Sequence, residues 1–174
     1  MGLNIIQIKE EGEEMDKVIE ETMAIIDMYP DIFPHMYKQG FKLVGRIKKG
    51  NLVLQDGVMI TFTQYLQGGK LSRNATTIKK PKDFIIHQIA SDQTQKGATK
   101  KVLDEFVDYC KSKGAGNILL TVRAFNERAR KFYERYGFKY DSDIQWNSQE
   151  TGIIPGVIYK LQLEKIKSEK FFQF

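Results

Sequence analysis

The feature that most constrains the fold is an alternation of strand and helix patterns between residues 84 and 138. Residues 84–90 form a nearly continuous apolar run, which is typical of a central strand. Apolar residues then follow helical spacing over 98–113, a second buried strand covers 117–122, and a shorter helix covers 126–136. Strands joined through a helix need a crossover connection. The pattern therefore predicts β-α-β units, with helices on both faces of a sheet.

The N-terminal half carries different patterns. The expected elements are a strand at 3–8, a helix at 13–28, a short helix within 29–40, β structure over 42–66 and a polar loop at 67–83. The dipeptide Asp56-Gly57 is typical of a type I′ hairpin turn. Further strands are expected at 138–143 and 156–163. Because hairpins come first and crossovers follow, we predict an α/β fold with a mixed sheet, in one domain covering 1–174.

Composition excludes several classes of protein. Four prolines and 14 glycines in 174 residues are too few for a collagen-like or low-complexity chain. The single cysteine, Cys110, excludes an internal disulfide framework and favours a reducing compartment, for which we expect the cytoplasm. No apolar run reaches the ~20 residues that span a bilayer, and no His, Cys and Asp cluster has metal-ligand spacing. The 27 basic and 22 acidic residues leave a net charge of +5, which suits an anionic ligand.

The strand-to-helix turn at residues 91–99 is the first candidate binding site. Gly97 lets the backbone approach a ligand closely, and the first N–H groups of a helix lack partners, which favours an anion such as a phosphate. Lys96, Lys100 and Lys101 add positive charge. The turn lacks the residues of a Walker loop and the other glycines of a dinucleotide fingerprint. A turn that serves packing alone would contain the same residues, so both interpretations stay open here.

A second motif points to a family. After a strand that ends in Val122, the chain follows the pattern Asn-x-x-Ala-x-x-Phe-Tyr-x-x-x-Gly-Phe, carried by Asn126, Ala129, Phe132, Tyr133, Gly137 and Phe138. This pattern closely resembles the GNAT family of N-acetyltransferases. Upstream, residues 96–103 resemble the acetyl-CoA loop of that family, Arg/Gln-x-x-Gly-x-Gly/Ala, with Thr94 and Thr99 departing from it. The two motifs together cover residues 84–140.

The resemblance implies a fold and a cofactor. Two parallel central strands, 84–90 and 117–122, are expected to splay apart around the thioester of acetyl-CoA, in a central mixed β-sheet flanked by helices. The implied cofactor-binding residues are Ile89 and Ser91 at the pantetheine arm, Gln95, Lys96, Gly97, Ala98 and Thr99 at the pyrophosphate, Asn126 at the arm, and Arg130 at the 3′-phosphate. Asn126 also suits a plain helix N-cap, and Arg130 also suits a solvated basic helix face.

The resemblance further implies acetyl transfer to a primary amine by direct attack, without a metal. Tyr133 would protonate the departing thiolate of coenzyme A; the alternative is an aromatic core residue beside Phe132. His87 titrates in the range of a useful base, yet it equally suits a buried structural histidine. An ordered water is a sufficient base in similar proteins.

Substrate selection is expected in the loop regions 28–40 and 144–156. Their aromatic residues give the candidate substrate-binding set Tyr29, Phe33, Tyr37 and Trp146. Aromatic side chains also close cores, so a packing role is the alternative. The acceptor is a small-molecule or protein amine, and neither loop carries the carboxylate cluster that would favour a polycation.

Two other functions fit the same residues. A catalytically degenerate member of the fold would bind coenzyme A or a protein partner, as Thr94 and Thr99 suggest. An enzyme of this fold acting on nucleic acid or a nucleobase would use Lys79, Lys80 and Lys82, although a solvated loop explains these lysines as well. The C-terminal tail, residues 165–174, carries three phenylalanines that would dock on the domain or be buried in a homodimer.

Overall fold

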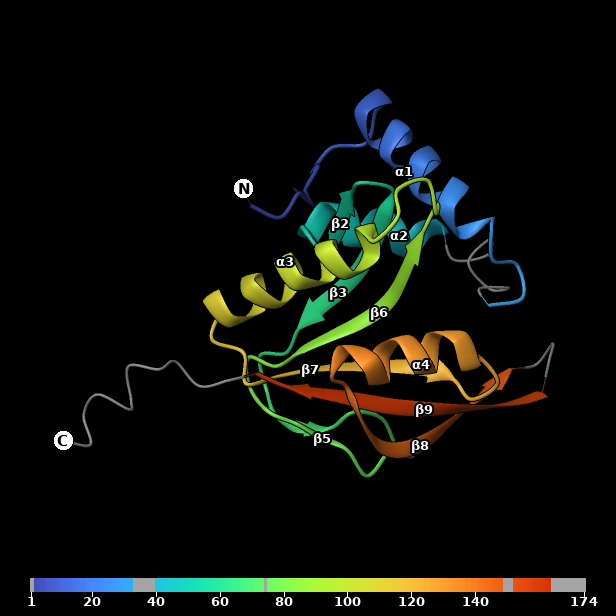
Figure 1. Ribbon diagram of the computed structural model, residues 1–174. Coiled ribbons are helices and arrows are strands. Elements are labelled where there is room, and N and C mark those ends of the chain that lie inside the picture. Colours follow the sequence, from blue (N-terminus) through green and yellow to red (C-terminus); the bar gives the residue numbers. More distant parts are fainter. Residues whose placement is uncertain (1, 33–39, 74, 149–151, 164–174) are drawn as a thin grey trace. The chain divides into compact units, whose positions relative to one another are not determined.

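Figure 1 shows the chain as a computed structural model with its helices and strands labelled. These elements belong to two compact units. The structure describes residues 2–32, 40–73, 75–148 and 152–163. The first unit lies within Met1–Thr63 and Ile86–Phe106, and the second within Gln64–Ile85 and Val107–Phe174.

The sheet of the first unit has the strand order β1-β2-β3-β6. These strands are β1 (Ile5–Ile6), β2 (Leu52–Gln55), β3 (Val58–Gln64) and β6 (Phe84–Ser91). β2 pairs antiparallel with both β1 and β3. The turn between β2 and β3 holds Asp56 at φ 51° and Gly57 at φ 74°. Two successive left-handed residues define a type I′ turn, so the predicted hairpin is confirmed.

Helices α1 (Glu13–Ile26) and α3 (Ala98–Ser112) confirm two predictions, whereas α2 (Gly40–Lys49) replaces β structure that was expected from residue 42 onward. Leu43 and Ile47 stand one helical turn apart, and both are buried in a core that also contains Met15, Ile25, Ile26, Leu52 and Met59. The β prediction overlooked this shared helical face. The helix ends at Gly50, whose φ of 73° supplies a left-handed residue.

The second unit contains a sheet in the order β7-β9-β8 and a separate pair of short strands. Its elements are β4 (Gly69–Lys70), β5 (Ile78–Lys79), β7 (Asn117–Arg123), α4 (Glu127–Tyr136), β8 (Lys139–Ser148) and β9 (Gly152–Gln162). β9 pairs antiparallel with both β7 and β8. The predicted strand before α4, the helix itself and the two later strands are confirmed.

Two loop predictions in this unit were wrong. Residues 67–83 include the β4–β5 pair, and most of 144–156 belongs to β8 and β9. Pro155 lies within β9, where it stands opposite Gln145 of β8 and its carbonyl accepts from the Ala124 N–H at 3.0 Å, while the β7 ladder starts at Gly156. Trp146 lies over Gly156, where an added Cβ would overlap the indole ring. The hairpin therefore depends on a small residue that resembles a loop signal in the sequence.

Cys110 lies on the buried face of α3. Burial raises the pKa of its thiol, so the reactive thiolate is scarce at neutral pH. We expect a disulfide reagent such as dithionitrobenzoate to label the native chain at least about tenfold more slowly than the guanidinium-unfolded chain. Equal rates in the two states would contradict the buried placement.

Candidate functional site

The turn that follows β6 is shaped by Asp92. Its backbone N–H donates to the Gly57 carbonyl at 2.8 Å. Its carboxylate accepts from the Thr94 hydroxyl at 2.7 Å and from the Thr94 backbone N–H at 2.9 Å. These two bonds hold the pKa of the Asp92 carboxyl below its usual value. Thr94, which stands where the resembled family has Arg or Gln, is therefore turned toward Asp92.

Tyr29 contacts the same turn. Its hydroxyl donates to the Ser91 carbonyl at 2.6 Å and accepts from the Gln93 side-chain amide at 2.8 Å. The Gln93 backbone N–H donates to the Ser91 hydroxyl at 2.9 Å. Gln93 itself has φ 62°, a left-handed conformation that these bonds support. Tyr29, predicted to contact substrate, thus binds the turn predicted to contact the cofactor.

Several backbone N–H groups at the end of this turn are available to a ligand. The N–H groups of Gln95, Lys96 and Gly97 make no hydrogen bond with any residue that the structure describes. The α3 bonds begin with the Lys101 N–H donating to the Gly97 carbonyl at 3.2 Å, so the N–H of Thr99 has no acceptor within the helix. Gly97 has φ 78° and open space where a Cβ would stand. This arrangement of N–H groups suits an anion.

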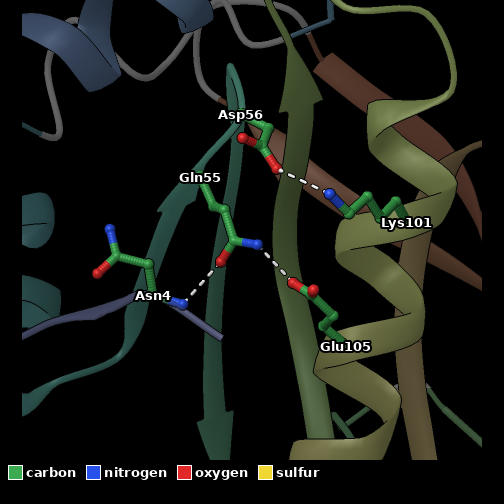
Figure 2. Close-up of polar contacts among 5 residues, drawn as sticks. All are labelled: Asn4, Gln55, Asp56, Lys101 and Glu105. Carbon is green, nitrogen blue, oxygen red and sulfur yellow. Dashed lines mark hydrogen bonds and ion pairs between the residues drawn. The ribbon is translucent and has the colours of Figure 1, made fainter. Parts of the chain in front are cut away.

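The hairpin between β2 and β3 also reaches the first turns of α3. Figure 2 shows Asp56 facing Lys101, with their charged atoms 3.8 Å apart, and the Gln55 amide donating to Glu105. Lys100 pairs with Asp104 at 3.0 Å. Lys96 is exposed and belongs to no ion pair among the described residues. Of the three lysines predicted here, Lys96 is thus the one whose charge is not partly neutralised by a neighbouring carboxylate.

Polar side chains of β6 pair with β3. His87 and Thr63 share a hydrogen bond of 2.9 Å between Nε2 and Oγ1, and the Thr61 hydroxyl donates to Gln88. His87 and Ile89 are both half-buried. The candidate base therefore has a fixed ring position with partial access to solvent.

The start of α4 is capped as the sequence predicted. The Asn126 Oδ1 accepts from the Ala129 N–H at 3.3 Å. Tyr133 is buried, with its ring centroid 5.6 Å from those of both Phe132 and Phe138. Burial raises the pKa of the Tyr133 hydroxyl, which keeps the proton on the oxygen. The aromatic core role predicted as an alternative for Tyr133 is thus present.

Arg130 is held within its own unit. Its Nε donates to the Tyr159 hydroxyl at 3.1 Å and its Nη1 donates to the Ala124 carbonyl at 3.0 Å. Tyr159 in turn donates to Glu134 at 2.8 Å. The bond to Tyr159 raises the pKa of the Arg130 guanidinium. Arg130 is therefore an anchored cation whose position does not depend on a ligand.

The remaining predicted residues differ in placement. Trp146 packs against Ala75, Ile144 and Ile158, as a core residue does. Phe33, Tyr37 and the tail at 165–174 lie outside the described residues. Among the described residues, the acidic, cysteine and histidine side chains form no group that could hold a metal ion. Likewise, none of the helices that the structure describes has the length and apolar character to cross a membrane.

The elements just described match a known family. The model of the acetyltransferase (GNAT) family matches residues 27–138, more than half of the chain. The chain belongs to the GNAT family. The match includes both the 91–97 turn and the β7–α4 segment, and it confirms the family that the sequence motifs suggested. The α/β fold class is confirmed as well.

Solved structures share the fold of this GNAT chain. An N-acetyltransferase from Staphylococcus aureus Mu50 has a TM-score of 0.58 at 13% identity, covering 89% of this chain and 97% of its own. NAA60 of Arabidopsis thaliana, solved with a bisubstrate analogue, has a TM-score of 0.59 at 15% identity, covering 83% and 95%. Ard1 from Thermoplasma volcanium has a TM-score of 0.53 at 15% identity, covering 84% of this chain and 94% of its own. Identities this low show the fold alone. Among curated protein sequences no match is found.

Sequence reasoning missed three features of this GNAT chain: the bonds of Asp92, the hairpin residue Gly57 beneath it, and the attachment of Tyr29. The spacing Asp92-x-Thr94 was a usable signal, because an Asp commonly bonds the backbone two residues on. The partners at Gly57 and Tyr29 are distant in sequence and carry no local signal.

Proposed function

We propose that this chain transfers an acetyl group from acetyl-CoA to a primary amine by direct attack. Membership of the GNAT family supports an acetyl transfer. The observation that carries the proposal is the set of unpartnered N–H groups from Gln95 to Gly97 at the start of α3, which suits the pyrophosphate of coenzyme A.

The cofactor contacts are proposed from both motifs. Ile89 and Ser91 would contact the pantetheine arm. The side-chain donor lost at Thr94 would be replaced by Gln93 or Gln95, and of these the Gln93 amide already donates to Tyr29, which favours the exposed Gln95. Lys96, Ala98 and Thr99 complete the pyrophosphate set. In the second unit, Asn126 uses its Oδ1 as a cap, which leaves its Nδ2 donors for the cofactor arm. Arg130, anchored by Tyr159, would face the 3′-phosphate.

The proposed reaction needs two proton transfers. The neutral amine nitrogen attacks the thioester carbonyl carbon, the carbon–sulfur bond then breaks, and Tyr133 gives its proton to the thiolate. The nitrogen loses a proton to His87 or to a water that His87 contacts. The raised pKa of Tyr133 keeps this acid protonated throughout the neutral range. Tyr29 and Trp146 stay proposals for the substrate side, with Tyr29 acting from its bond to the turn.

A glycine pair tests the cofactor proposal. Gly97→Ala places a side chain at φ 78° in the proposed loop, and Gly152→Ala places one at φ 76° at the start of β9, with open space around both. We expect Gly97→Ala to raise the Kd of acetyl-CoA about tenfold, since the strained loop would shift its N–H groups. Gly152→Ala should leave the Kd unchanged. Isothermal titration calorimetry with acetyl-CoA measures the Kd of both variants and of the unmodified chain. If the unmodified chain does not bind acetyl-CoA, the proposed function is refuted.

The degenerate alternative is favoured by one observation, the engagement of Thr94 with Asp92 instead of a ligand. It predicts acetyl-CoA binding without turnover. Release of free thiol from acetyl-CoA across a panel of amines, including peptides, lysine, polyamines and aminoglycosides, separates the two functions.

A further inference from the structure

The 92–97 turn is held by a carboxylate, which is unexpected beside a proposed anion site. Asp92 contributes an acceptor to both Thr94 donors and a backbone N–H to Gly57. A negative charge here weakens the binding of an anion through Coulomb repulsion. The carboxylate of Asp92 instead contributes to the shape of the turn through its two hydrogen bonds to Thr94.

The hairpin tip at residues 55–57 forms the support for that carboxylate. A Cβ added at Gly57 would overlap the Asp92 carboxylate, so only a glycine leaves room for it. The φ of 74° at Gly57 also favours glycine.

The same tip is attached to neighbouring elements. The Asn4 backbone N–H donates to the Gln55 side-chain oxygen at 2.7 Å, and the Gln55 amide donates to Glu105 on α3. Asp56 pairs with Lys101, one helical turn before Glu105 (Figure 2). The hairpin tip thus contacts both ends of the 92–97 turn: Asp92 at its start, and helix α3, which follows its end.

We propose that Asp92 is a positioning residue for acetyl-CoA, and that the Gly57 hairpin tip holds it in place. Through Thr94 and Gly57, Asp92 would fix the N–H groups of Gln95 to Gly97 in the geometry that receives the pyrophosphate. This inference rests on the proposed function. Backbone donors set in place before binding would act together with the Gln95 side chain in place of the side-chain donor that the family pattern has at position 94.

For Asp92→Ala, charge and geometry predict opposite changes in the affinity for acetyl-CoA. Asp92→Ala removes a negative charge near an anion site, so electrostatics alone would tighten acetyl-CoA binding. Positioning predicts the reverse, a rise in Kd of about tenfold, because two hydrogen bonds of the turn are lost. Asp92→Asn keeps an acceptor oxygen and should restore a Kd within about threefold of the unmodified chain. Thr94→Val, which loses one of the two bonds, should fall between them.

The readout compares two acetyl donors. Acetyl-CoA is titrated by calorimetry and acetyl-pantetheine, which lacks the pyrophosphate, by NMR shift changes at millimolar concentration. Asp92→Ala should weaken the binding of acetyl-CoA and leave the binding of acetyl-pantetheine unchanged. Equal weakening of both donors, or tighter binding of acetyl-CoA, would overturn the positioning role. Failure of the unmodified chain to bind acetyl-CoA would instead overturn the proposed function itself.

A second pair of variants tests the hairpin tip. Gly57→Ala and Gly50→Ala introduce the same backbone strain, at φ 74° and 73°, but only the first side chain meets Asp92; the second meets the flexible Gln7. Gly57→Ala should raise the Kd of acetyl-CoA about tenfold, while Gly50→Ala should leave it unchanged. Equal Kd values for these two variants would show that the hairpin tip does not act through Asp92. Circular dichroism melts identify a variant that fails to fold, in which case Thr94→Val and Asp92→Asn decide the outcome.

Discussion

Tyr133→Phe is expected to lower kcat of acetyl transfer by about 10²- to 10⁴-fold, the range that a positioned acid contributes. The substitution removes the proton that would go to the thiolate and keeps the ring that packs on Phe132 and Phe138. The free energy of unfolding and the Kd of acetyl-CoA should therefore change little. Stopped-flow release of thiol with the best amine from the panel measures kcat.

The control for this variant is Tyr136→Phe on the same helix. Tyr136 is half-buried and stacks on Phe132 with ring centroids 6.4 Å apart, so it has a similar aromatic setting. We expect its kcat to match that of the unmodified chain. If Tyr133→Phe retains half or more of the activity, Tyr133 is a core residue and another group protonates the thiolate.

The largest expected loss of stability is for Phe106→Ala. Phe106 is fully buried in α3, and its ring meets Phe62 edge-on at a centroid distance of 5.1 Å. Removing a buried aromatic ring leaves a cavity and costs about 3–5 kcal/mol in free energy of unfolding. Urea unfolding measures the loss as a lower midpoint. Phe125→Ala, at a position 57% exposed, should change the free energy by less than about 0.5 kcal/mol. Similar losses for both variants would contradict the assigned core.

The helices and strands that the sequence predicted correctly have local causes. β6, α3, β7 and α4 follow from apolar periodicity, and the Asp56-Gly57 turn follows from the need for two left-handed residues. The α2 helix was missed because the one-turn spacing of Leu43 and Ile47, which places both on one buried face, was overlooked. The β8–β9 hairpin was underestimated because Pro155 and Gly156 resemble a loop.

In the candidate site, too, some residues could be located from the sequence and some contacts could not. Gly97 and the cap residue Asn126 could be located from the sequence, since a turn glycine and a helix start depend on neighbouring residues alone. The attachments of Asp92 to Gly57 and of Tyr29 to Ser91 could not. Their partners stand 35 and 62 positions away in the sequence, respectively, and the local pattern does not predict which residues they are.

The amino-acid sequence by itself thus determined the family, the order of most helices and strands, and the position of the turn for which we propose acetyl-CoA binding. Those properties depend on side-chain periodicity and on residue types at short, regular spacing. The tertiary structure alone decided that Asp92 faces the hairpin tip and Thr94, that Tyr29 binds the turn, and that Trp146 joins a core. Such contacts arise when distant segments pack together, and the free energy that selects them is shared among residues far apart in the chain.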